Sequence, residues 1–97
     1  ITTIADSLAS PMAMPYSFGV THHYADEIVR VEDDELRQAM RTYQNILKIT
    51  AEPACAASLA ALTGPLKERA TGRHVGIIAC GSNISMARYL NLLEQKQ

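Results

Sequence analysis

Residues 80–83, Cys-Gly-Ser-Asn, place a thiol, a glycine and two polar side chains directly after the apolar run 75–79. In open α/β sheets, ligands bind beyond the carboxyl ends of strands, where helix N-termini present free N–H groups. Cys80 at such a position is either a small packed hydrophobe, the usual fate of a free cysteine, or a group that faces a ligand. A disulfide with Cys55 is the less favoured alternative, because two cysteines in a chain without secretory features usually stay reduced.

Two segments are predicted to be the strands of an α/β domain. Residues 27–31 alternate and are β-branched at their centre, which indicates a short strand. Residues 74–79 form an apolar run of the kind expected for a strand buried on both faces of a parallel sheet. Because the segment between them reads as helical, the two strands are expected to be parallel and joined by a right-handed crossover.

Three helices complete the predicted order of strand, helix, helix, strand, helix. The acidic run 32–35 suits the first turn of a helix that lasts to about residue 49, with Glu32 or Asp33 as its cap. These carboxylates are interpreted as a helix start rather than as a metal site, because further ligands at useful spacing are missing. A second helix of small side chains begins at Pro53 and is followed by a further turn at 66–70.

The third predicted helix covers residues 84–97, with Ser82 or Asn83 as its cap. Upstream of the first strand, the prolines at positions 11 and 15 predict an irregular, packed lead-in over residues 1–24, apart from a short helical turn around residues 5–8.

Composition excludes several classes of partner. The 97 residues suffice for one domain at most, and nine Lys and Arg nearly balance ten Asp and Glu. A chain without a basic surface is a poor candidate for binding nucleic acid or anionic membranes, and no apolar stretch approaches the roughly 18–20 residues of a membrane span. A cytoplasmic location is therefore expected. The first residue is Ile1 rather than Met, so the chain is expected to be a piece of a longer protein.

Five short segments, taken together in this order, resemble a known family. They are Thr-Ile-Ala-Asp at 3–6, Asp-Glu-Ile-Val-Arg-Val at 26–31, Asp-Glu at 34–35, Glu-Pro-Ala-Cys-Ala-Ala at 52–57, and Ile-Ile-Ala-Cys-Gly-Ser-Asn-Ile at 77–84. The series resembles the C-terminal part of the pyridoxal-phosphate enzymes of fold type II, most closely the threonine and serine dehydratases. The resemblance covers nearly the whole chain and implies a single partial domain, a fragment of the parallel three-layer sheet domain that holds the cofactor.

The resemblance also implies a role for Cys80. In these enzymes the residue at this strand end, usually Ser in threonine dehydratases and Cys in some serine dehydratases, faces the pyridine nitrogen of the cofactor. A neutral thiol is not a strong acid, so the ring nitrogen need not be protonated and the ring becomes a milder electron sink. Such a sink favours β-elimination of a hydroxyl group, which would yield a 2-oxo acid and ammonia from a hydroxy amino acid.

Further residues are assigned to the cofactor site by the same resemblance. Gly81, Ser82 and Asn83 are expected to hold the turn against the cofactor, although Ser82 replaces the second glycine of many members. Glu52 matches a family carboxylate close to the cofactor ring, and a simple helix cap beside Pro53 is an equal alternative. Ser7 stands where many members carry a glycine that passes the cofactor.

Parts of the family's machinery are missing from these residues. None of the three lysines, Lys48, Lys67 and Lys96, lies in a setting like the family's cofactor-linking motif, and no run of glycines is available to cradle a phosphate. His22 and His23 are interpreted as surface or packing residues rather than metal ligands. No catalytic residue is therefore predicted here, and the chain alone is expected neither to retain pyridoxal phosphate covalently nor to catalyse.

The partners and the alternatives follow from the two-strand prediction. Two parallel strands cannot form a stable covered sheet, so the chain is expected to need the missing N-terminal part of the enzyme or to associate with itself as a dimer. The leading hypothesis is a fragment of a dehydratase that acts on threonine or serine. The alternatives are a free-standing binding or assembly module that keeps half of the fold, and a fragment of a related racemase.

Overall fold

The acidic run starts a helix, as predicted. The computed structural model describes residues 2–95, and in it α2 (Asp33–Thr42) begins with a capping box: the Glu32 side chain accepts the N–H of Glu35, and the Glu32 N–H donates to Glu35 Oε1 at 2.8 Å. A π-helical turn, η2 (Tyr43–Leu47), extends α2. Lys48 then adopts the left-handed conformation with φ 58° and ends the helix close to the predicted position.

The other predicted helices are also present. Helix α3 (Pro53–Thr63) starts with proline at its first position, and α4 (Lys67–Ala70) forms the predicted further turn. The short turn expected near residues 5–8 is the 3₁₀ helix η1 (Asp6–Leu8). Helix α5 (Met86–Glu94) occupies most of the predicted third helix, whose last residues, 96–97, lie outside the described residues.

The predicted cap of α5 is wrong. Ser85, rather than Ser82 or Asn83, caps the helix, and its hydroxyl accepts the N–H of Arg88 at 3.1 Å. The reason is local: the Ile84 N–H donates to the Ser82 carbonyl at 2.8 Å, so residues 82–84 form a tight turn before the helix begins.

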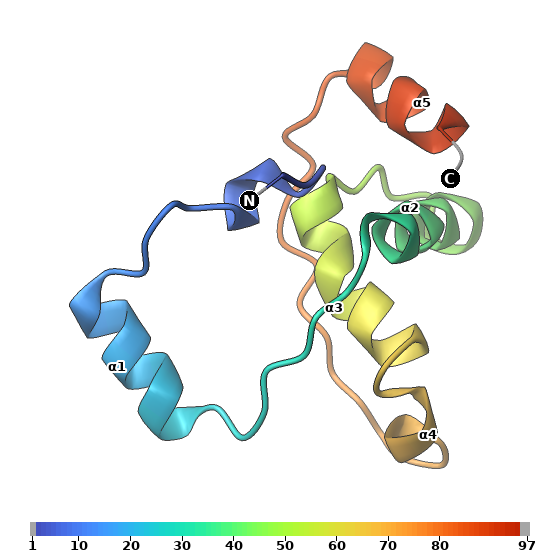
Figure 1. The fold of residues 1–97 in the computed structure, drawn as a ribbon. Coiled ribbons are helices and arrows are strands. Elements are labelled where there is room, and N and C mark those ends of the chain that lie inside the picture. Colours follow the sequence, from blue (N-terminus) through green and yellow to red (C-terminus); the bar gives the residue numbers. More distant parts are fainter. Residues whose placement is uncertain (1, 96–97) are drawn as a thin grey trace.

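The irregular lead-in predicted for residues 1–24 is wrong in its second half. Helix α1 (Pro15–Tyr24) occupies this part, and Pro15 stands at its first helical turn, where proline is tolerated because that N–H has no helical partner. Figure 1 shows α1 set apart from the other helices. All ten residues of α1 are exposed. Its apolar side chains do not gather on one face, so the sequence lacks the periodic pattern that marks an amphipathic helix.

The two predicted strands are not formed within residues 2–95, where every regular element is helical. Segments 27–31 and 74–79 run as irregular chain between helices. The physical reason is that a strand is stabilised by backbone hydrogen bonds to neighbouring strands, and this chain contributes only two candidates. The parallel pairing and its crossover therefore stay predictions.

The core lies where α2 packs against α3 and α5 (Figure 1). Leu36 and Met40 of α2 are its largest fully buried side chains. They are joined by Ala5, Ala39, Ala56, Ala60, Tyr89 and Leu92. The alanines of α3 let its backbone lie close to α2, as small side chains do at helix contacts. In the described part of the chain, no helix has the length and apolar character needed to cross a membrane.

Candidate functional site

One face of α3 lies along residues 78–81. The backbone N–H of Glu52, which precedes the helix, donates to the Gly81 carbonyl at 3.3 Å. At the other end of the contact, the Ser58 hydroxyl donates to the Ile78 carbonyl at 2.8 Å. Positions 52, 55 and 58 are spaced by three residues and therefore share one face of the helix. Residues 78–81 thus run antiparallel to the first two turns of α3.

Gly81 is the closest point of this contact. Its φ is +144°, a conformation that residues with a side chain rarely adopt. A Cβ atom on Gly81 would lie 2.9 Å from Glu52 Oε1 and 3.3 Å from the carboxyl carbon. The site therefore requires glycine both for its backbone angle and for the space that the Glu52 carboxylate fills.

The Glu52 side chain does not cap α3. Its carboxylate makes no hydrogen bond to the start of the helix and lies against Gly81 instead. The alternative of a simple helix cap is therefore wrong, and the position of Glu52 beside the cofactor ring stays a prediction.

The two cysteines near this contact are free thiols. Cys80 is exposed, whereas Cys55 is buried with Tyr43 and Ala51 beneath the segment. Burial raises the pKa of the Cys55 thiol, the nearby Cys80 raises it further, and the backbone amides of Cys80 and Gly81 oppose part of the shift. Cys55 is thus the packed thiol of the pair, and Cys80 is the one that can meet a ligand.

Three other residues predicted from the sequence, Ser82, Asn83 and Ser7, lie outside the contact between Glu52 and Gly81. Ser82 and Asn83 follow Gly81, are exposed, and belong to the tight turn before α5. Ser7 is exposed in η1, which contacts α3. The structure therefore brings Glu52 into contact with Gly81, the residue after Cys80, and leaves Ser82 and Asn83 exposed.

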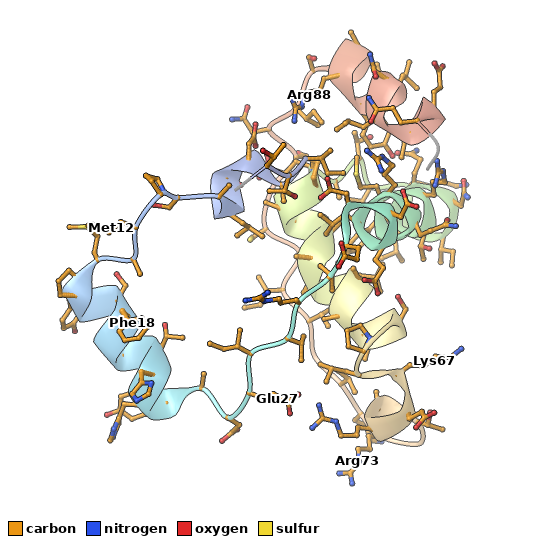
Figure 2. All side chains as sticks on the ribbon, in the orientation of Figure 1. Met12, Phe18, Glu27, Lys67, Arg73 and Arg88 are labelled. Carbon is orange, nitrogen blue, oxygen red and sulfur yellow. The ribbon has the colours of Figure 1, made fainter. Side chains whose placement is uncertain are left out.

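The N-terminal segment is tied to the same part of the molecule. The Thr3 hydroxyl and the Ile4 N–H donate to the two carboxylate oxygens of Asp33, at the start of α2. From α5, Arg88 donates to the Ile4 carbonyl at 3.3 Å and lies 3.6 Å from the Asp6 carboxylate (Figure 2). These contacts hold η1 between α3 and α5.

The histidines and the acidic run serve local structure. His22 stacks on Phe18 with ring centroids 5.8 Å apart, and His23 meets the Tyr24 ring edge-on at 4.6 Å. Asp34 pairs with Arg37 at 2.8 Å, and the rest of the run forms the cap and the Thr3 tether. Within residues 2–95, no group of three or more His, Cys, Asp or Glu side chains is arranged to hold a metal ion.

The donors present fit part of a pyridoxal phosphate site. The exposed Cys80 thiol is a hydrogen-bond donor that suits a pyridine nitrogen. The two described lysines lie elsewhere: Lys48 donates to the Asn45 carbonyl at 3.0 Å, and Lys67 projects from α4, at the far end of α3 (Figure 2). The described part therefore supplies groups for the ring nitrogen, while its lysines do not reach this segment.

A cavity of about 1000 Å³ lies at the other end of α3, away from Cys80. It is lined by the chain before and after α4 and by residues 24–27. Glu27 and Arg69 bridge its rim with two hydrogen bonds of 2.7 and 2.8 Å. Hydrogen bonding to Arg69 and its charge lower the pKa of the exposed Glu27 carboxyl. No cysteine is among the residues that line this cavity, so it is not part of the site around Cys80.

Ser58 is the residue that the sequence did not reveal. A single serine within a helix of small residues carries no motif, and its contact depends on where residues 74–79 run. A signal was present only in its spacing, since it lies six residues after Glu52 and three after Cys55.

Comparison with known protein families gives a match over most of the chain. A family model described as "Pyridoxal-phosphate dependent enzyme" matches residues 1–81.

Three curated proteins show the range of similarity. Phenylserine dehydratase from Ralstonia pickettii is 45% identical over 93 residues, which are 93% of this chain and 28% of the relative. L-threo-3-hydroxyaspartate ammonia-lyase from Saccharomyces cerevisiae is 35% identical, over 98% of this chain and 29% of the relative. Serine racemase from Schizosaccharomyces pombe is 33% identical, over 96% and 28%. The chain thus spans less than a third of the length of these relatives.

Proposed function

The chain belongs to the family of pyridoxal-phosphate dependent enzymes, and from this premise we propose that it is the C-terminal part of a lyase that removes water and ammonia from a hydroxy amino acid. The relatives named for phenylserine, L-threo-3-hydroxyaspartate and L-threonine support this reaction class. Each of these amino acids carries a hydroxyl group on its β-carbon. A β-hydroxy amino acid is therefore the proposed substrate class.

The proposed reaction converts the hydroxy amino acid to a 2-oxo acid and ammonia. The substrate loses its α-proton and its β-hydroxyl, which leaves as water, and the resulting enamine tautomerises and is hydrolysed to a 2-oxo acid and ammonia. Pyridoxal phosphate, when bound, supplies the electron sink that makes the α-proton removable. The lysine and the phosphate cradle would come from residues outside this chain.

Cys80 is proposed to donate its thiol hydrogen to the ring nitrogen without transferring the proton. The observation that carries this role is the contact of Gly81 with Glu52, which leaves the Cys80 thiol exposed beside the start of α3. Gly81, Ser82 and Asn83 would hold the turn against the ring. Glu52 would lie beside the ring edge, at a position its contact with Gly81 already defines.

The proposal that the chain is a partial domain is supported by its exposed apolar side chains. Ile28 is 75% exposed and Ile78 is 76% exposed, although both lie in segments with the composition of buried strands. Neighbouring strands from the rest of the enzyme would cover them. A second copy of the chain is the alternative partner.

The function is tested on the complete protein loaded with pyridoxal phosphate. L-Serine, L-threonine, phenylserine and 3-hydroxyaspartate are supplied in turn, and 2-oxo acid and ammonia are measured together. We expect the two products in equal amounts from at least one substrate. Conversion of L-serine to D-serine without 2-oxo acid would instead favour the racemase alternative, which the similarity to serine racemases supports.

The role of Cys80 is tested by two substitutions in the same protein. Cys80→Ala should retain the cofactor but lower kcat about tenfold, the rate equivalent of about 1.4 kcal/mol, which is within the contribution of one hydrogen bond. Cys80→Ser restores a neutral donor and should recover most of the rate. Unchanged kcat in Cys80→Ala, compared with the exposed control Ser10→Ala, would show that the Cys80 thiol takes no part in the reaction.

A further inference from the structure

The Ser58 hydroxyl has an unusual hydrogen-bond acceptor for a hydroxyl within a helix. Such side chains commonly donate to the carbonyl four residues earlier in the same helix. Thr42 and Thr63 do so here, to Gln38 and Leu59, both at 3.0 Å. Ser58 instead leaves its helix and donates to the Ile78 carbonyl at 2.8 Å, two residues before Cys80.

This bond is one of two that hold residues 78–81 against α3. The second is the backbone bond from Glu52 to the Gly81 carbonyl at 3.3 Å, and Cys80 lies between the two. The segment is not part of a sheet in the described chain, so these bonds replace the ladder that would otherwise define its course. The Ser58 bond is the shorter of the two and is the one made by a side chain.

We propose that Ser58 is a positioning residue for Cys80: by holding the Ile78 carbonyl, it sets where the Cys80 thiol points. This inference rests on the proposed function of Cys80. A hydrogen bond from a neutral thiol weakens steeply with distance and angle, and misplacement by about 1 Å can cost on the order of a hundredfold in rate. Ser58 touches neither cofactor nor substrate, so its effect passes through the position of residues 78–81.

The experiment compares Ser58→Ala, Ser58→Thr and Thr63→Ala in the complete protein. Alanine is a good helix former, so Ser58→Ala removes the hydroxyl without disturbing α3. Ser58→Thr keeps the hydroxyl. Thr63→Ala is the matched control, because it removes a hydroxyl from the same helix that bonds only within that helix.

Two measurements are made on the cofactor-free protein. Hydrogen exchange of the amides at 79–81 and alkylation of Cys80 by iodoacetamide, located by peptide mass spectrometry, should both be about 2- to 10-fold faster in Ser58→Ala. Both should stay near the unaltered rates in Ser58→Thr and Thr63→Ala. Equal rates in Ser58→Ala and Thr63→Ala would overturn the proposal.

A third measurement tests whether the hydrogen bond from Ser58 to Ile78 affects the reaction rate. In the loaded enzyme, Ser58→Ala should lower kcat by about 2- to 10-fold, the effect expected for the loss of one hydrogen bond. KM should change less than about twofold. Loosened exchange with unchanged kcat would overturn the positioning role. If the unaltered protein has no elimination activity, the proposed function fails, and the exchange and alkylation rates still decide whether Ser58 anchors the segment.

Discussion

Position 81 requires glycine for two reasons, the backbone conformation there and the packing of the Glu52 side chain against it. Replacement by alanine would place a methyl group 2.9 Å from Glu52 Oε1 at a φ of +144°. We expect Gly81→Ala to lower the free energy of unfolding of the complete protein by about 1–3 kcal/mol, the cost of a strained backbone. Denaturant unfolding measures this loss.

Gly76→Ala is the matched control for this change. Gly76 lies in the same stretch of chain, has nothing within 4 Å of its added Cβ, and has no positive φ. An equal loss of stability in the two variants would contradict the account of Gly81, because general stiffening of the segment would then explain both.

Residue-scale prediction from sequence worked where a residue type carries its own chemistry. Glu52, Cys80 and Gly81 are all named from the 52–57 and 77–84 segments, and the structure brings Glu52 into contact with Gly81, next to Cys80. Ser58 was not named, since a hydroxyl reveals its partner only after the fold has placed one. The cap of α5 was misplaced by two or three residues, because serine and asparagine at 82, 83 and 85 are equally good caps in isolation.

At the scale of elements, Arg37 joins α2 to α5. The residue is 9% exposed, and its side chain donates to the Leu92 carbonyl at 3.1 Å, to Asp34 at 2.8 Å and to Gln95 Oε1 at 2.7 Å. Arg37→Met keeps the apolar stem and removes all three bonds. We expect it to lower the free energy of unfolding by about 1–3 kcal/mol, since the Leu92 carbonyl would lose its partner.

Arg69→Met is the control for Arg37→Met. Arg69 makes two hydrogen bonds to the Glu27 carboxylate, but both partners are exposed, and exposed ion pairs contribute little. Thermal unfolding of the two variants should therefore show a clear loss for Arg37→Met and none beyond error for Arg69→Met. A larger loss for Arg69→Met would mean that exposed charge pairs rather than the buried arginine hold the helices.

A helix could be predicted from the sequence where its capping residues, its apolar periodicity or its first proline lie within the helix itself. The cap and periodicity of α2 and the proline of α3 are contained within each helix, and both were predicted. Helix α1 was missed because its apolar residues gather on no face and its prolines were interpreted as breakers. The strands predicted at 27–31 and 74–79 are not formed in the described residues, and two strand segments alone do not make a stable sheet.

At the scale of the whole molecule, the chain is more open than a complete domain of its length. The Cα radius of gyration is 14.1 Å, whereas about 12.5 Å is expected for a compact domain of this size. Ile78, at 76% exposure, is a prominent part of the uncovered surface. This shape agrees with the proposal that the chain is a partial domain whose remaining contacts come from elsewhere.

The openness leads to a prediction for the isolated 97-residue chain. We expect it to associate with rising concentration, and Ile78→Lys to weaken this association, because a charge interrupts the exposed apolar run. Sedimentation velocity over a concentration series measures the effect. Ile46→Lys is the control, since Ile46 is 72% exposed but lies in η2. Equal effects of the two changes would mean that residues 74–79 are not the associating surface.

The contact of Arg88 with Ile4 has a consequence for the order of events during protein synthesis. The two residues are 84 positions apart, yet they secure the segment that carries η1. At a synthesis rate of about 5–20 residues per second, Ile4 must wait on the order of ten seconds before Arg88 exists. The contacts of residues 4–6 therefore stay incomplete until α5 has been made, and a ribosome that stalls before α5 would leave η1 without its anchor on that helix.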